Sequence, residues 1–244
     1  MKEIKEYGLF RSGTNFLRVI LQENYEVSLL TNVGGWKHGL YDLPQQLGRE
    51  VDCAVCVKNP YAWVLSFYNH RHPQKDVAFD EFARKPLTLK REGPDRPVSA
   101  ENPLRLWVSM YEHWLGVQLQ KHQKFLFRYE TVLADPIGSI QELVQKLGLT
   151  RRKPWHYRFR RALGVAAREP KFFLPSIRLG AVPQNYKDKH IKRGDSFNAS
   201  HYTKHEYLKS FSPDLLKFAN EQLDSGLLDR LGYQKPGVDA LIAA

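Results

Sequence analysis

The stretch that decides the fold covers residues 4–21 and reads IKEYGLFRSGTNFLRVIL. Its first part, residues 4–10, is typical of a short strand. Apolar side chains then recur at helical spacing at Phe16, Leu17, Ile20 and Leu21. The polar turn Arg11 to Asn15 lies between the two segments. The sequence therefore predicts a strand, a tight loop and a helix in succession, which is the repeating unit of α/β proteins with parallel sheets.

Further strands follow along the chain. Short apolar runs at 27–30, 52–57 and 124–129 have the length and composition of strands. The run at 52–57, DCAVCV, is hydrophobic almost throughout, as expected where both faces of a parallel sheet are covered. Cys53 and Cys56 stand three apart in this strand and so face opposite sides of it. They are predicted to be structural, with neither a shared metal nor a disulfide.

Helices are predicted where a capping residue precedes a proline. Four such pairs begin apolar stretches with helical spacing: Asn59-Pro60, Asn102-Pro103, Asp135-Pro136 and Ser212-Pro213. The last of these helices is expected to continue to about Gly232. Because strands and helices alternate, we expect an α/β fold, a three-layer α/β/α sandwich with a mainly parallel central sheet.

The length and composition are those of a single globular domain. The chain has 244 residues, of which 42% are hydrophobic and 12% aromatic, enough for one sizeable core. We expect one domain over residues 1–244, with a loop-rich part at 151–205 that covers the acceptor or cofactor. The longest apolar runs are too short for a membrane span, and the N-terminus lacks the apolar core of a signal peptide. A cytoplasmic protein without a transmembrane segment is expected.

The positive charge is concentrated in one segment. The formal net charge is +11, and residues 151–171 hold eight Lys and Arg side chains against one Glu, which accounts for seven of the eleven excess charges. Such a segment favours an anionic partner: a nucleotide, a polyanionic acceptor, a nucleic acid or an acidic membrane surface. A solvated basic surface without a partner is the alternative.

The predicted loop at 11–15 has the features of an anion-binding site. Its place before a helix presents unpaired backbone N–H groups and the positive end of the helix dipole. Gly13 lets the backbone approach a ligand closely, Ser12 and Thr14 add hydroxyl donors, and Arg11 supplies a permanent charge. The loop contains no G-x-x-x-x-G-K-[ST] pattern, which disfavours an ordinary ATP-dependent kinase.

The segment RSGTNF, residues 11–16, resembles the 5′-phosphosulfate loop of the sulfotransferases that use 3′-phosphoadenosine 5′-phosphosulfate (PAPS). That loop has a Lys or Arg, then Ser-Gly-Thr, a variable residue and an aromatic. The resemblance implies a P-loop-like sulfotransferase fold of the bacterial, cytoplasmic type. It also implies that Arg11 contacts the sulfonate and its bridging oxygen, that Ser12, Gly13, Thr14 and Asn15 bind the 5′ phosphate, and that Phe16 lies near adenine.

A second segment, residues 57–68, reads VKNPYAWVLSFY and is similar to the 3′-phosphate site of the same family. The family pattern places a basic residue and a serine eight positions apart, which Lys58 and Ser66 match. Lys58 would end a strand and Ser66 would lie two turns into the next helix, so that one phosphate could touch both. Lys58 stands where Arg is usual, which keeps the charge and loses the bidentate fork.

Two later segments extend the resemblance in family order. Residues 128–136, RYETVLADP, resemble a stretch whose role in the family is chiefly structural. Residues 193–198, RGDSFN, resemble a degraded form of the late elements that close over the 3′ phosphate. The resemblance therefore adds Arg193 and Gly194 to the residues expected to bind the cofactor.

The catalytic base is expected in the segment Trp36-Lys37-His38-Gly39. Many family members carry K-x-H here, whose histidine deprotonates the acceptor, whereas in this chain the lysine and histidine are adjacent. We expect His38 to be exposed in a cleft, because it follows a strand and the glycines Gly34 and Gly35. It would act as the general base, because imidazole titrates near neutral pH. Lys37 would neutralise charge on the transferring group. A carboxylate base, or a His38 that is only a surface residue, are the alternatives.

The resemblance implies a sulfotransferase that moves a sulfonate group from PAPS to a hydroxyl or amine acceptor, such as a glycan or a small metabolite. Adenosine 3′,5′-bisphosphate (PAP) is left, and no metal is required. Nucleic acid is not the expected partner. Two other functions stay open: a P-loop-like nucleotide kinase, and a polyanion or nucleic-acid binding module that uses residues 151–171.

Overall fold

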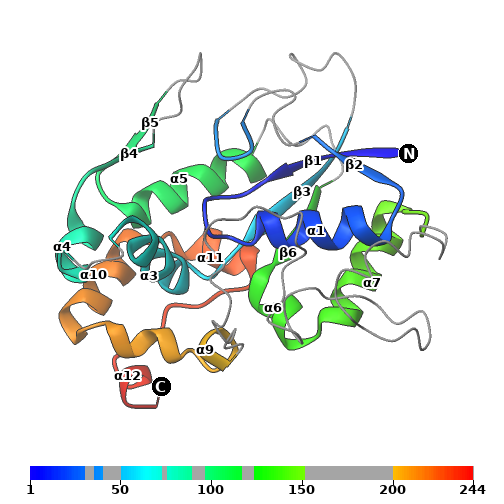
Figure 1. Cartoon of the computed structure of the whole chain (residues 1–244). Helices are drawn as coiled ribbons and strands as arrows, with labels where there is room; N and C mark the ends of the chain where they lie inside the picture. Colours follow the sequence, from blue (N-terminus) through cyan, green and yellow to red (C-terminus); the bar gives the residue numbers. More distant parts are fainter. Residues whose placement is uncertain are drawn as a thin grey trace.

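The computed structural model describes residues 1–30, 36–40, 51–72, 76–89, 97–116, 124–151 and 200–243. Four parallel strands form its central sheet, in the order β2-β1-β3-β6 (Figure 1). Their bounds are Lys2–Tyr7 for β1, Val27–Leu29 for β2, Asp52–Val57 for β3 and Lys124–Arg128 for β6. A separate antiparallel pair consists of β4 (Leu87–Leu89) and β5 (Val98–Ala100).

Helices follow the strands along the chain. They are α1 (Thr14–Asn24), α3 (Pro60–Arg71), α4 (Phe79–Arg84), α5 (Pro103–Leu115), α6 (Tyr129–Ala134), α7 (Pro136–Leu147), α9 (Ser200–Thr203), the 3-10 helix η2 (Glu206–Ser210), α10 (Pro213–Gln222), α11 (Ser225–Leu231) and α12 (Ala240–Ala243). The predicted capping residues are confirmed. Asn59, Asn102, Asp135 and Ser212 each accept a backbone N–H from the first turn of the helix that follows.

The sheet is covered on both faces. Along β3, Cys53, Val55 and Val57 pack into one hydrophobic cluster with α3, α5, α10 and α11. Ala54 and Cys56 point the other way, into a second cluster with α1 and α7. The expected α/β class with a mainly parallel sheet is therefore confirmed, and helices on both faces are consistent with an α/β/α sandwich. The cysteines are free, buried and on opposite faces, as predicted.

One helix expected near the C-terminus is in fact two. Leu223 leaves the helical conformation, with φ −93° and ψ 136°, and this ends α10. Asp224 then accepts a hydrogen bond from the backbone of Leu227 at 2.6 Å and caps α11. The leucine spacing continues across this break because both helices present their leucines to the same core. The end at Gly232, with φ 73°, agrees with the prediction.

The strand order creates a switch point at the carboxyl edge of the sheet. From β1 the chain crosses to β2 on one side, whereas β3 lies on the other side of β1. Ligands of open α/β sheets bind where the crossover direction reverses in this way. Because β1, β3 and β6 are parallel, the residues that follow them, from Gly8, Lys58 and Tyr129 onwards, emerge at one edge.

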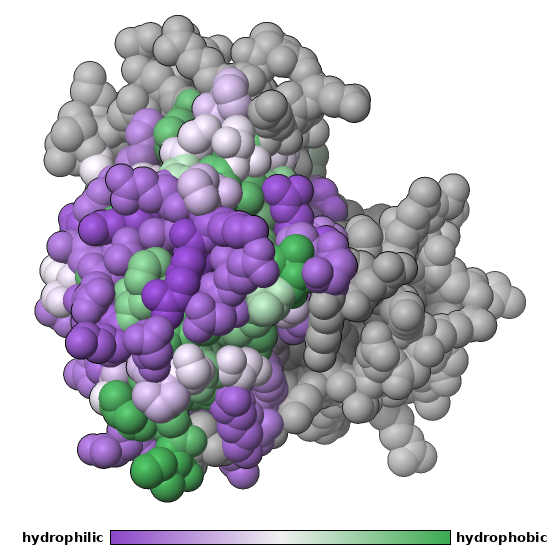
Figure 2. Space-filling model, turned by 90° about the vertical axis from the view of Figure 1, so that its left-hand side faces the viewer, coloured by the Kyte–Doolittle hydropathy of each residue, from purple (hydrophilic) through white to green (hydrophobic). Residues whose placement is uncertain are grey.

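The face that carries α3, α4 and α10 is mostly hydrophilic, as Figure 2 shows. Apolar surface on this face gathers at its lower end, the level at which Figure 1 places α12. Ile242 of α12 is 89% exposed, and Val238, two residues before that helix, is 51% exposed. None of the described helices combines the length and apolarity that a membrane crossing requires.

Candidate functional site

The loop predicted to bind an anion lies between β1 and α1, as expected. It turns through two left-handed residues, Arg11 with φ 66° and Gly13 with φ 97°. A Cβ atom on Gly13 would lie 2.7 Å from Cδ2 of Tyr129, so the glycine is needed both for its φ and for this close approach. Among the described residues, no side chain caps the first turn of α1. The helix therefore begins with backbone donors that can face a ligand.

Ser12 differs from the expectation that its hydroxyl would be offered to a ligand. The side chain is fully buried, and its hydroxyl donates to the backbone carbonyl of Leu9 at 2.7 Å. The backbone N–H of Ser12 donates to the same carbonyl at 3.1 Å. Ser12 therefore stabilises the loop, because both of its donors are used within it. Thr14 is buried as well, whereas Arg11 is exposed.

Lys37 reaches the same loop from the segment after β2. Its Nζ atom donates to Oδ1 of Asn15 at 2.9 Å and lies 3.3 Å from Oε1 of Glu6. Glu6 is fully buried in β1, so the ammonium group is held between the strand and the start of α1. This places a second cation beside the loop of Arg11. Glu6 was missed by the sequence analysis because a charged residue inside a strand carries no motif.

His38 is buried, which corrects the expectation that it would be exposed in a cleft. Its side chain is 6% exposed, stacks on Phe10 with ring centroids 4.2 Å apart, and hydrogen-bonds the carbonyl of Gly8 through Nδ1. Burial, reinforced by the charge of Lys37, lowers the pKa of His38 to about 3. The imidazole is therefore neutral at physiological pH, with its proton on Nδ1 and Nε2 as an acceptor. Phe10 and Trp36 pack around the imidazole ring in an aromatic cluster.

Lys58 directly follows β3 and is buried, with 3% of its surface exposed. Its Nζ atom lies 4.1 Å from the ring centroid of Tyr129 and 4.4 Å from that of Tyr202. The two rings are nearly perpendicular, with centroids 5.3 Å apart. Burial lowers the pKa of Lys58 to about 7, Glu130 opposes this shift, and the charge of Arg11 adds to it. The ammonium group is thus held by aromatic faces, which replace only part of its hydration.

Ser66 meets Lys58 at the same tyrosine. Burial raises the pKa of the Tyr202 phenol, and Ser66 is near enough to oppose this shift, while the Tyr202 ring also covers Lys58. Lys58 and Ser66 thus both lie near Tyr202, and it stays a prediction that one phosphate touches both. The sequence analysis missed Tyr202, whose ring lies over Lys58.

The two predicted anion sites are neighbours. Arg11 is close enough for its charge to act on Lys58, on Tyr129 and on Tyr202. Phe16, predicted to lie near adenine, packs edge-on against Tyr129 with centroids 6.2 Å apart. The loop of β1 and the end of β3 therefore form one basic and aromatic site at the switch point.

Glu130 links this site to other segments of the chain through two hydrogen bonds. Its Oε1 atom accepts the backbone N–H of Asn59 at 2.9 Å, and its Oε2 atom accepts the hydroxyl of Tyr233 at 2.9 Å. The carboxylate therefore ties the ends of β3 and β6 to the segment after α11. Tyr129 and Glu130 belong to the segment 128–136, to which the resemblance assigned a chiefly structural role.

Other predicted residues lie outside the described part of the chain. These are Arg193, Gly194 and all of the basic segment 151–171 except Arg151, which is exposed and forms a β-bridge with Tyr25. Within the described ranges, no three or more His, Cys, Asp or Glu side chains are grouped as metal ligands. A comparison with protein-family models finds no matching family, and a comparison with curated proteins finds no relative.

Proposed function

We propose that this chain is a PAPS-dependent sulfotransferase with the P-loop-like fold of that family. The observation that carries the proposal is the convergence of the Arg11 loop with Lys58 and Ser66 at adjacent ends of parallel strands. PAPS carries an anionic group at each end of one nucleoside. A site with two neighbouring cationic ends and tyrosine rings between them suits such a molecule.

The proposed donor contacts follow the strands. Arg11 and the backbone of Gly13, Thr14 and Asn15 bind the 5′ end, whereas Lys58 and Ser66 bind the 3′ phosphate. Phe16 lies beside the base, and Ser12 holds the loop in shape through Leu9. The Tyr202 ring must move aside for the 3′ phosphate to reach Lys58, because this ring covers the ammonium group.

The transfer proceeds in line, without a metal. The bond from sulfur to the bridging phosphate oxygen breaks, and a bond from sulfur to the acceptor oxygen or nitrogen forms. Arg11 stabilises the charge on the departing PAP. Positioning of the reactants and this electrostatic stabilisation are the main sources of the rate enhancement. Lys37 neutralises charge on the sulfonate, and the acceptor proton passes to Nε2 of His38. Burial is the main cause of the low His38 pKa, and an anionic sulfonate beside Lys37 offsets only the smaller cause, the charge of Lys37.

Thermal unfolding with PAP tests the proposal. A ligand at 100 times its Kd stabilises the folded state by about 2.7 kcal/mol, which corresponds to a rise in Tm of about 5–10 °C for a chain of this size. We expect this rise with PAP and a much smaller one with ATP and magnesium. Lys58→Met should abolish it, and Lys209→Met, a change at an exposed lysine on η2, should leave it intact.

Two other outcomes of the ligand-binding experiments would indicate the alternative functions. Stabilisation by ATP with magnesium and none by PAP would indicate a nucleotide kinase. Salt-sensitive oligonucleotide binding without a PAP response would indicate a polyanion-binding module on residues 151–171. Once PAP binding is established, radiolabelled PAPS and a panel of glycans, hydroxylated metabolites and amines identify the acceptor.

A further inference from the structure

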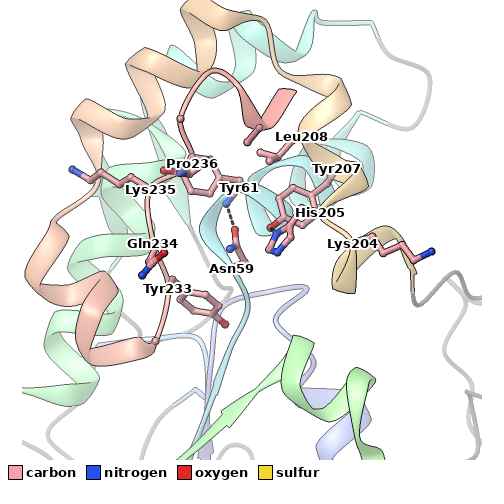
Figure 3. Close-up of a pocket in the computed structure, with 13 residues that line it drawn as sticks. Asn59, Tyr61, Lys204, His205, Tyr207, Leu208, Tyr233, Gln234, Lys235 and Pro236 are labelled. Carbon is pink, nitrogen blue, oxygen red and sulfur yellow. Dashed lines mark hydrogen bonds between the residues drawn. The ribbon is translucent and has the colours of Figure 1, made fainter. Parts of the chain in front are cut away.

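A pocket of about 600 Å³ opens beside the start of α3 (Figure 3). Its walls come from α3, from the turn between α9 and η2, and from the coil at 232–237. None of the residues assigned to the donor lines it, although Asn59 in its wall directly follows Lys58. The volume lies within the range of small-molecule sites, roughly 300–1,000 Å³.

The inner wall of this pocket is aromatic. Tyr61, Tyr207 and Tyr233 line it and are all buried. Their hydroxyls are already engaged: Tyr61 with Oδ1 of Asn220, Tyr207 with Nδ1 of His205 at 2.6 Å, and Tyr233 with Glu130 at 2.9 Å. The tyrosines therefore offer ring surface to a ligand, with their hydroxyls directed to protein partners.

Hydrogen bonds between the elements around the pocket fix its shape. Asn220 accepts from Tyr61 and donates to the carbonyl of Pro236 at 3.0 Å, which ties the coil to α10 and α3. On the other side, His205 holds a left-handed backbone with φ 58°. The shape exists before a ligand arrives, so a ligand loses little free energy in ordering it.

The remaining polar groups of the pocket are suited to an anion. Oδ1 of Asn59 accepts the backbone N–H of Tyr61 at 3.0 Å, so its amide group is left as the donor. Asn59 and His205 both turn into the middle of the view, and Lys204 and Lys235 extend on opposite sides of the mouth (Figure 3). No described residue that lines the pocket is acidic.

From these features we infer that the pocket binds a small aromatic molecule that carries one carboxylate or sulfate group. The ring packs on the tyrosines, the anionic group takes the donors of Asn59 and His205, and the lysines attract it. A polyhydroxylated sugar acid fits less well, because the hydroxyls that could bond its OH groups are already engaged. This inference stands on the pocket alone and does not rest on the proposed function.

Binding of 4-hydroxybenzoate, followed by saturation-transfer NMR and calorimetry, tests the inference. We expect saturable binding that is stronger than that of phenol, which lacks the carboxylate, and of glucuronate, which lacks the aromatic ring. The double variant Lys204→Glu and Lys235→Glu should weaken it by about tenfold or more. The matched variant Lys209→Glu and Lys217→Glu changes two exposed lysines outside the pocket and should bind normally.

Two further variants test whether 4-hydroxybenzoate binds in this pocket. His205→Gly removes the imidazole while a glycine accepts the left-handed backbone, and binding should be lost. Lys58→Met should bind normally, since Lys58 does not line the pocket. The inference is overturned if 4-hydroxybenzoate binds no better than phenol, if charge reversal at the rim has no effect, or if binding disappears in Lys58→Met, which would put the anion in the donor site instead.

Discussion

At the scale of single residues, the most informative group is the ammonium of Lys58. It is buried between two tyrosine rings, and its pKa is lowered to about 7. A phosphate beside it would raise that pKa again, because an anion favours the charged form. Above pH 7 the binding of PAP must therefore draw a proton from solution.

This proton uptake is the first prediction. The affinity for PAP should fall by up to about tenfold per pH unit above pH 7, and calorimetry in buffers of different ionisation enthalpy should detect nearly one proton taken up at pH 8.5. Lys58→Arg keeps the charge at every pH and should remove this dependence. A pH dependence that is the same in both proteins would show that Lys58 does not meet the phosphate.

His38 makes a second prediction, on stability. Its pKa in the folded state, about 3, is below the ordinary value of 6.5, so the unfolded chain takes up a proton first as the pH falls. Its full contribution to stability is present above pH 6.5 and declines toward pH 3. Between pH 6.5 and 5 the loss from this group should reach about 2 kcal/mol.

Urea unfolding at pH 7.5 and pH 5 measures this loss. His38→Asn removes the titrating ring and keeps a donor for the carbonyl of Gly8, so the drop in stability between the two pH values should be about 2 kcal/mol smaller than in the natural chain. Equal drops in the two proteins would place the imidazole in a less buried environment.

At the scale of elements, the start of α1 depends on how closely the backbone approaches Tyr129. Gly13 and Gly148 both have positive φ, at 97° and 60°, but only Gly13 has a neighbour where a Cβ would stand. We predict that Gly148→Ala costs about 1 kcal/mol and that Gly13→Ala costs at least about 2 kcal/mol. Denaturant unfolding gives both values, and equal costs would mean that Tyr129 moves aside freely.

At the scale of the whole molecule, Glu130 joins segments that are far apart in the sequence. It binds Asn59 at the end of β3 and Tyr233 after α11. Tyr233→Phe should cost about 1–3 kcal/mol, because it leaves a partly buried carboxylate oxygen without its partner.

A double-mutant cycle isolates this contact. The cost of Tyr233→Phe should shrink by about 0.5–3 kcal/mol when Glu130 is already changed to Gln, since the two side chains act on one hydrogen bond. Additive costs would show that the bond contributes nothing to the junction between the C-terminal segment and the sheet.

The sequence by itself determined the strands of the central sheet, the helices that begin at a capping pair, and their order, whereas it did not predict α4 or the pair β4 and β5. Apolar spacing identified the four strands of the sheet, and the Asn-Pro, Asp-Pro and Ser-Pro pairs identified helix starts, because capping and proline geometry act within a few residues. It also placed Lys58 and Ser66 correctly, one at the end of a strand and one two turns into the next helix. The interruption at Leu223 was missed, since both helices present leucines to the same core.

Only the tertiary structure decided which groups are buried and what they touch. It turned Ser12 inward, buried His38 against Phe10, and brought Tyr202 onto Lys58 from the far end of the chain. The physical reason is that hydration and charge, which set the pKa of each group, depend on neighbours that come from distant segments. The exposure of a side chain cannot be predicted from residues that become its neighbours only when the strands pair.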